Sequence, residues 1–198
     1  MSLRRIAPSV LEIGAALLGG ALAAPAHAQS LASAQAELSS ALADAEGNLT
    51  TAEAIEMNMK DWKSRFDSYK AQFDDINNRI GQANAYCQGT YEHDEYERRL
   101  AQCNAMFSQL DGLKAQLEPE RQNLSDEADK LQKREADNEQ AMQAIQSRLT
   151  DGLQHLTFAC AMLSAQEFAA SCKVPPAPGP RTQPMVDRMN ASIAGNKP

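Results

Sequence analysis

The four cysteines of the chain are the residues with the clearest capacity for chemistry. An even number of thiols predicts two disulfides in an oxidising compartment, and no spacing among them is the CxxC of zinc ribbons or thioredoxin-like proteins. Four cysteines allow three pairings. The helical pattern favours one of them, which joins Cys87 to Cys103 and Cys160 to Cys172.

Acidic and histidine residues give weaker chemical signals. Glu92, His93, Asp94 and Glu95 are metal-ligating residue types, but consecutive residues do not converge on one ion, so we expect them to complement a helix dipole instead. His155 is isolated among leucines, so we assign it no chemistry. No P-loop, Gly-rich dinucleotide turn, HExxH or GxSxG motif occurs. The sequence therefore predicts a protein that is not an enzyme, with no catalytic, cofactor-binding or metal-binding residues.

Two long rows of apolar residues predict the elements that carry the cysteines. In the first row, steps of four and three alternate, and all ten members are apolar. These members are Ile55, Met59, Trp62, Phe66, Tyr69, Phe73, Ile76, Ile80, Ala83 and Cys87. The second row has the same spacing from Tyr96 to Leu163, and fifteen of its twenty positions are apolar. A long helix that presents one narrow stripe to a partner helix gives such a row, so we predict an all-α protein.

The first two cysteines predict how the helices are connected. Cys87 and Cys103 both belong to the rows, so a bond between them places the chain reversal near Glu95. The same pairing sets Leu31 against Ala159, which gives two arms of matched length. We therefore predict a long antiparallel coiled-coil helical hairpin. Its parts are a first arm at residues 29–87, a disulfide-stapled tip at 88–98, and a second arm with its base at 99–172.

A short helical turn is expected at the end of the base. Ser164 and Glu167 have the spacing of a capping box, which predicts a new helix start. A chain reversal there lets Cys172 return to Cys160. In one straight helix these two residues would be separated by about 18 Å, which is too far for a disulfide.

Residues 173–198 are predicted to be a Pro-rich linker followed by a disordered tail. Five prolines and one glycine occur in residues 173–184, and this composition favours an extended chain. Met185, Met189 and Ile193 recur on one helical face, so docking of the tail is the alternative.

The first 28 residues have the layout of a secretory signal peptide. Arg4 and Arg5 precede an apolar stretch of twelve residues, 13–24, and small residues flank the predicted cleavage point between Ala28 and Gln29. A stable membrane span needs roughly 20 apolar residues, so an uncleaved anchor is the weaker interpretation. The sequence therefore predicts a periplasmic or secreted protein.

The charge of the mature chain limits its partners. Residues 1–28 contain two of the 19 basic and one of the 26 acidic residues, so 17 basic and 25 acidic residues remain, with a net charge of −8. Nucleic acids and anionic membranes are bound by basic surfaces, so both are excluded as partners. The expected partner is a protein, either a different chain or a second copy of this one.

Two groups of residues are predicted to contact this partner. Tyr86 and Tyr91 lie outside the apolar rows and close to the turn, so they are the better candidates for exposed contact residues. The base contains more large apolar residues than one seam requires, and apolar surface of that extent usually marks an interaction site. Its candidate interface residues are Leu153, Leu156, Phe158 and Met162.

Together these features favour a non-enzymatic exported coiled-coil protein that acts as a structural or adaptor component of a bacterial cell-envelope assembly. The alternatives are a periplasmic holdase-type chaperone and a helical subunit of a secretion apparatus. The chaperone is disfavoured by the acidic charge, because many coiled-coil chaperones of that kind have basic surfaces.

Overall fold

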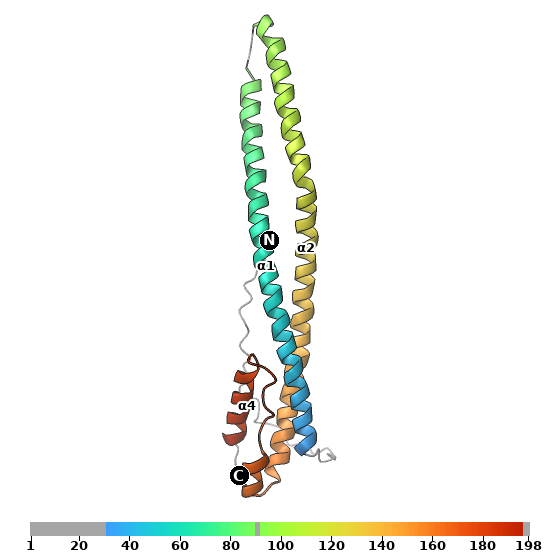
Figure 1. Cartoon of the computed structure of the whole chain (residues 1–198), viewed down its shortest axis with the longest axis vertical. Coiled ribbons are helices and arrows are strands. Elements are labelled where there is room, and N and C mark those ends of the chain that lie inside the picture. Colours follow the sequence, from blue (N-terminus) through green and yellow to red (C-terminus); the bar gives the residue numbers. More distant parts are fainter. Residues whose placement is uncertain (1–30, 90–91, 196–198) are drawn as a thin grey trace, which may run out of the picture. The chain divides into compact units, whose positions relative to one another are not determined.

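The computed structural model of the protein describes residues 31–89 and 92–195, so the predicted signal peptide lies outside the described residues. Its two long helices, α1 (Leu31–Cys87) and α2 (His93–Ala161), pack against each other, and two short helices follow (Figure 1). The short helices are α3 (Ala165–Ser171) and α4 (Gln183–Gly195). Over the described ranges the structure is all-helical in class and contains no strand, as the sequence predicts.

The chain divides into two compact units, each containing a part of α1 and a part of α2. We call Thr50–Glu139 the turn unit, because it contains the connection between the long helices. The terminal unit contains the rest, of which residues 31–49 and 140–195 are described.

Contacts between the helices of the turn unit pair rising residue numbers on α1 with falling numbers on α2. The Trp62 indole Nε1 donates a hydrogen bond of 2.8 Å to the carbonyl of Leu124. Farther along α1, Cys87 is bonded to Cys103, with 6.0 Å between the Cα atoms. The only connected core described in this unit is small and consists of Ile76, Ala83 and Leu110, with five partly buried apolar residues around it.

The terminal unit has the larger core, because all four helices contribute to it. Small side chains line the α1 face, where Ala34, Ala41 and Ala45 are fully buried beside Leu38. A Cβ atom added at Gly152 would lie only 3.0 Å from Leu38, so glycine allows the close approach of the two helices at this point. The one glycine of the second apolar row is therefore a packing residue.

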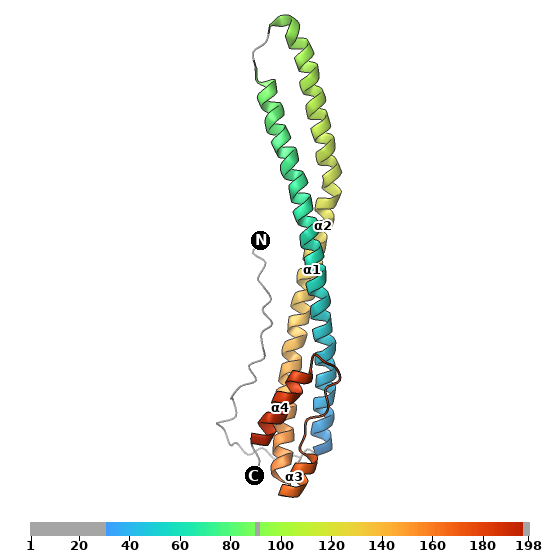
Figure 2. The ribbon, with the colours of Figure 1, turned by 60° about the vertical axis from the view of Figure 1, so that its left-hand side comes forward.

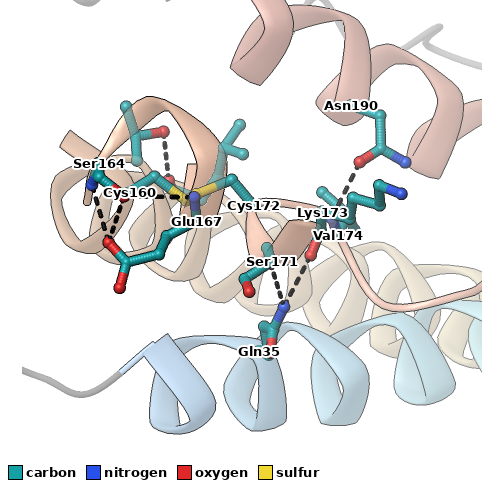
Figure 3. Close-up of a disulfide and its surroundings, with 11 residues drawn as sticks. Gln35, Cys160, Ser164, Glu167, Ser171, Cys172, Lys173, Val174 and Asn190 are labelled. Carbon is teal, nitrogen blue, oxygen red and sulfur yellow. Dashed lines mark hydrogen bonds between the residues drawn. A yellow bond between two sulfur atoms is a disulfide. The ribbon is translucent and has the colours of Figure 1, made fainter. Parts of the chain in front are cut away.

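The capping box predicted for α3 is present in the terminal unit (Figure 3). The Glu167 carboxylate accepts hydrogen bonds from the backbone N–H and hydroxyl of Ser164, while the Ser164 hydroxyl accepts one from the Glu167 N–H. The hydrogen bonds from Ser164 lower the pKa of Glu167. The turn before α3 brings Cys172 back to Cys160, with 5.8 Å between their Cα atoms. The four cysteines thus form the two pairs that the sequence predicts.

The C-terminal segment differs from the predicted disordered tail. Its apolar face, formed by Val186, Met189 and Ile193, is 2–4 % exposed and packs into the core of the terminal unit. Figure 2 shows α4 lying along the long helices of this unit. The physical reason is that α1 and α2 bury only one stripe each, so apolar residues outside those stripes remain to be covered. We call residues 173–195 the C-terminal strap.

Candidate functional site

The end of α1 is held in a defined geometry next to the disulfide of the turn unit. The Tyr86 hydroxyl donates a hydrogen bond of 2.8 Å to the Gln102 side-chain carbonyl. The guanidinium carbon of Arg99 lies 4.5 Å from the centre of the Tyr86 ring, and Arg99 also pairs with Glu95 at 3.3 Å. A ring held on both its hydroxyl and its face is preorganised, although 38 % of Tyr86 remains exposed.

Two further apolar side chains on α2 are exposed in the same part of the turn unit. Tyr96 is 53 % exposed and Leu100 is 47 % exposed, although both belong to the second apolar row. Cys103 is joined to Cys87, the last residue of α1, so these two positions precede the part of α2 that α1 covers. We call Tyr86, Tyr96 and Leu100 the turn patch.

Sequence reasoning selected Tyr86 but assigned Tyr96 and Leu100 to the buried seam. The signal that identifies them is the disulfide itself, because seam positions before Cys103 have no counterpart on a helix that ends at Cys87. Tyr91, the other predicted contact residue near the turn, lies outside the described residues.

A ladder of four aromatic rings, Trp62, Phe66, Tyr69 and Phe73, runs along α1 in the turn unit. Adjacent ring centres are 5.2, 6.5 and 6.1 Å apart, and the first and last pairs are stacked. Their spacing is that of the predicted seam, yet Phe66 is 38 % exposed and Phe73 is 40 % exposed. The seam prediction therefore accounts for only part of the surface of these rings.

A shallow hollow lies beside this ladder, between α1 and α2. It is lined by Tyr69, Phe73, Lys114, Leu117, Glu118 and Arg121. Its volume of about 190 Å³ is below the roughly 300 Å³ at which small-molecule sites begin. The hollow is thus better suited to single side chains of a protein partner than to a cofactor.

The four residues predicted to form an interface at the base differ in their surroundings. Leu153 is 8 % exposed and Leu156 is completely buried, because both belong to the core shared with α3, α4 and the strap. Phe158 and Met162 are 59 % and 77 % exposed. Only this second pair is accessible to a partner while the strap is docked.

The strap is attached to α1 by polar contacts at two places. The Gln35 amide donates hydrogen bonds to the carbonyls of Ser171 and Lys173, at 3.1 and 3.0 Å (Figure 3). The Val174 N–H donates to the Asn190 side chain at 2.9 Å, which links the start of the strap to α4. Gln35 therefore satisfies backbone groups at the end of α3 and at the start of the strap.

Glu46 makes the second attachment. Its carboxylate accepts hydrogen bonds from the N–H and hydroxyl of Thr182, both at 3.0 Å, and pairs with Arg181 at 3.2 Å. Burial acts to raise the pKa of Glu46, but these hydrogen bonds together lower it. A Cβ atom at Gly179 would overlap the same carboxylate, so a side chain there would displace Glu46 from its present position.

One titratable pair between the helices was not expected from the sequence. The His155 ring nitrogen Nδ1 lies 3.2 Å from the Glu37 carboxylate, and both side chains are partly exposed. Helical spacing did not reveal this acid because Glu37 comes from the other long helix. No group of three or more metal-ligating side chains is found among the described residues.

No protein-family model, curated protein or solved structure matches this chain. Within the described ranges, no helix is both long enough and apolar enough to cross a membrane.

Proposed function

We propose that this chain is an exported, non-enzymatic protein that binds another protein as a structural or adaptor component of a bacterial cell-envelope assembly. The observation that carries the proposal is the turn patch, where Tyr86, Tyr96 and Leu100 are 38–53 % exposed beside a disulfide. Aromatic residues at rigid, exposed positions are the usual anchors of protein–protein interfaces, since little conformational entropy is lost when they bind.

We further propose that the two long helices form one antiparallel coiled-coil hairpin. Arg148 pairs with Asp44 in the terminal unit, and Arg65 pairs with Glu127 in the turn unit. Both pairs are centred on the same residue number, 96, as expected for a single reversal near Glu95.

Export into the periplasm, or secretion, follows from the predicted signal peptide. The two disulfides and the lack of a membrane-spanning helix over residues 31–89 and 92–195 are compatible with it. Intact mass spectrometry of the exported protein tests this part of the proposal. We expect a chain that begins at Gln29, and a mass that retains residues 1–28 would refute cleavage at this point.

The adaptor role is tested by substituting exposed apolar residues in each of the two units and comparing capture of a partner. We expect Tyr96→Ser with Leu100→Ser to abolish capture of one saturable partner from a periplasmic extract. The matched control, Phe158→Ser with Met162→Ser, also replaces two exposed apolar side chains, in the terminal unit, and should retain the partner. If the Phe158 and Met162 variant loses the partner while the Tyr96 and Leu100 variant retains it, the interface lies at Phe158 and Met162 instead of the turn patch.

A holdase-type chaperone is the second candidate, and the exposed rings of Phe66 and Phe73 are the observation that favours it. A holdase should suppress the aggregation of several unrelated unfolded proteins at near-stoichiometric ratio. An adaptor, or a helical subunit of a secretion apparatus, should protect none of them. Protection of several clients would therefore replace the adaptor proposal.

A further inference from the structure

The middle of the turn unit buries no side chain completely. On α1, every residue between Ile55 and Ile76 is partly or largely exposed, and the same holds on α2 between Leu110 and Leu124. This stretch includes the aromatic ladder, whose large rings are covered by one neighbouring helix only. Two helices alone provide one stripe each, so side chains of this size need a further surface to become fully buried.

A row of alternating charges runs beside the ladder on α1. Its members are Lys63, Asp67, Lys70 and Asp74. Each directly follows a ring of the ladder in sequence, so the row is turned by about 100° around the helix and runs parallel to the rings. The side chains form two pairs within the helix, Lys63–Asp67 and Lys70–Asp74, and are 53–61 % exposed.

We infer that the ladder face of α1 binds the same face of a second copy of this chain, with the two α1 helices antiparallel. A two-fold axis between Ser68 and Tyr69 sets Lys63 opposite Asp74 of the second copy, and Asp67 opposite Lys70 of the second copy. All four contacts across the interface then join opposite charges. Phe66 and Phe73 of both copies contribute the apolar centre.

The order of the charges selects this arrangement over others. In a parallel two-fold pair the two charge rows would lie on opposite sides of the interface and would not meet, whereas the antiparallel pair brings both rows to the same side. A row that reads lysine, aspartate, lysine, aspartate pairs all four members with opposite charges when the second copy is reversed. Self-complementarity of this kind is required of a two-fold symmetric interface and is not required of a contact with a different protein. The inference is independent of the compartment and of the turn patch, so it goes beyond the proposed function.

Sedimentation velocity of the purified, oxidised chain over a range of concentrations tests this inference. We expect a reversible dimer for the wild-type chain. Lys63→Glu with Lys70→Glu makes the row entirely acidic, and Asp67→Lys with Asp74→Lys makes it entirely basic. Each variant alone should dimerise about tenfold more weakly or worse, since four contacts change from attraction to repulsion.

An equimolar mixture of the acidic and basic variants should restore dimers, and circular dichroism should show unchanged helix content in each. This rescue separates lost pairing from misfolding, because a misfolded variant would not regain a partner when mixed. Lys130→Glu with Lys133→Glu, which makes the same charge change on exposed positions of α2, should leave dimerisation unchanged.

Phe66→Ser with Phe73→Ser should give a monomer at all concentrations. A monomeric wild-type chain at high concentration would overturn the inference, as would charge variants that dimerise as well alone as when mixed. Neither result bears on capture of a partner by the turn patch, so the two proposals fail separately.

Discussion

Docking of the C-terminal strap can be tested with a single substitution, Met189→Ala. Met189 is 2 % exposed and lies between Val186 and Ile193 on the buried face of α4. Truncation of a buried methionine costs about 2–5 kcal/mol, because the lost contacts leave a cavity. A helix of 13 residues is marginal on its own, so this loss should undock α4 without unfolding the long helices.

The lower limit of about 2 kcal/mol corresponds to roughly thirtyfold faster hydrogen exchange in the affected segment. Exchange measured by mass spectrometry should therefore accelerate about thirtyfold or more in residues 187–193 and remain unchanged in the turn unit. Asp187→Ala, at an exposed position of α4, is the matched control and should have little effect, because its hydrogen bond with Gln183 is exposed to solvent. If the α4 amides of the wild-type chain exchange without protection, or if both variants behave alike, the packing described for the strap is wrong.

Three further predictions concern the attachment of the strap to Glu46 and the disulfide of the turn unit. The pKa of Glu46 is lowered from 4.5 in the folded chain, so the stabilisation of the docked strap by its carboxylate is complete above about pH 4.5 and is lost as the pH falls through the lower folded value. Hydrogen exchange in the strap should therefore accelerate as the pH falls through that value, and Glu46→Gln should remove this pH dependence. Gly179→Ala should accelerate exchange in the strap at neutral pH by displacing the same carboxylate, and an unchanged rate would contradict the close approach. Cys87→Ser with Cys103→Ser should lower the free energy of unfolding in urea by about 3 kcal/mol, the value for a disulfide that closes a loop of this length. A loss below about 1 kcal/mol would contradict stabilisation of the turn unit by this disulfide.

Much of the local structure could be predicted from the sequence, because it depends on neighbouring residues. The alternating steps of four and three predicted both long helices, and Ser164 with Glu167 predicted the start of α3. The cysteine pairs followed from the same helical geometry, since a disulfide requires Cα atoms within about 7 Å. These inferences need only the period of a helix and the reach of a side chain.

Exposure along the seam could not be predicted in the same way. The spacing assigns Phe66, Phe73, Tyr96 and Leu100 to buried positions, but burial also depends on what stands opposite each residue. Leu100 precedes the part of α2 that α1 covers, and the two phenylalanines are covered by one helix alone. The spacing of an apolar row identifies the residues that can face a partner helix, but it does not show where that partner helix ends.

The sequence by itself determined the helical class of this protein and the partners of its cysteines. Only the tertiary structure decided that residues 183–195 form a helix and that Val186, Met189 and Ile193 share one core with Leu156. The reason is that a short proline-flanked segment has too little local stability to fold alone. Its helix exists because an apolar surface built from residues more than 100 positions earlier in the chain, including Leu38 and Leu42, receives it.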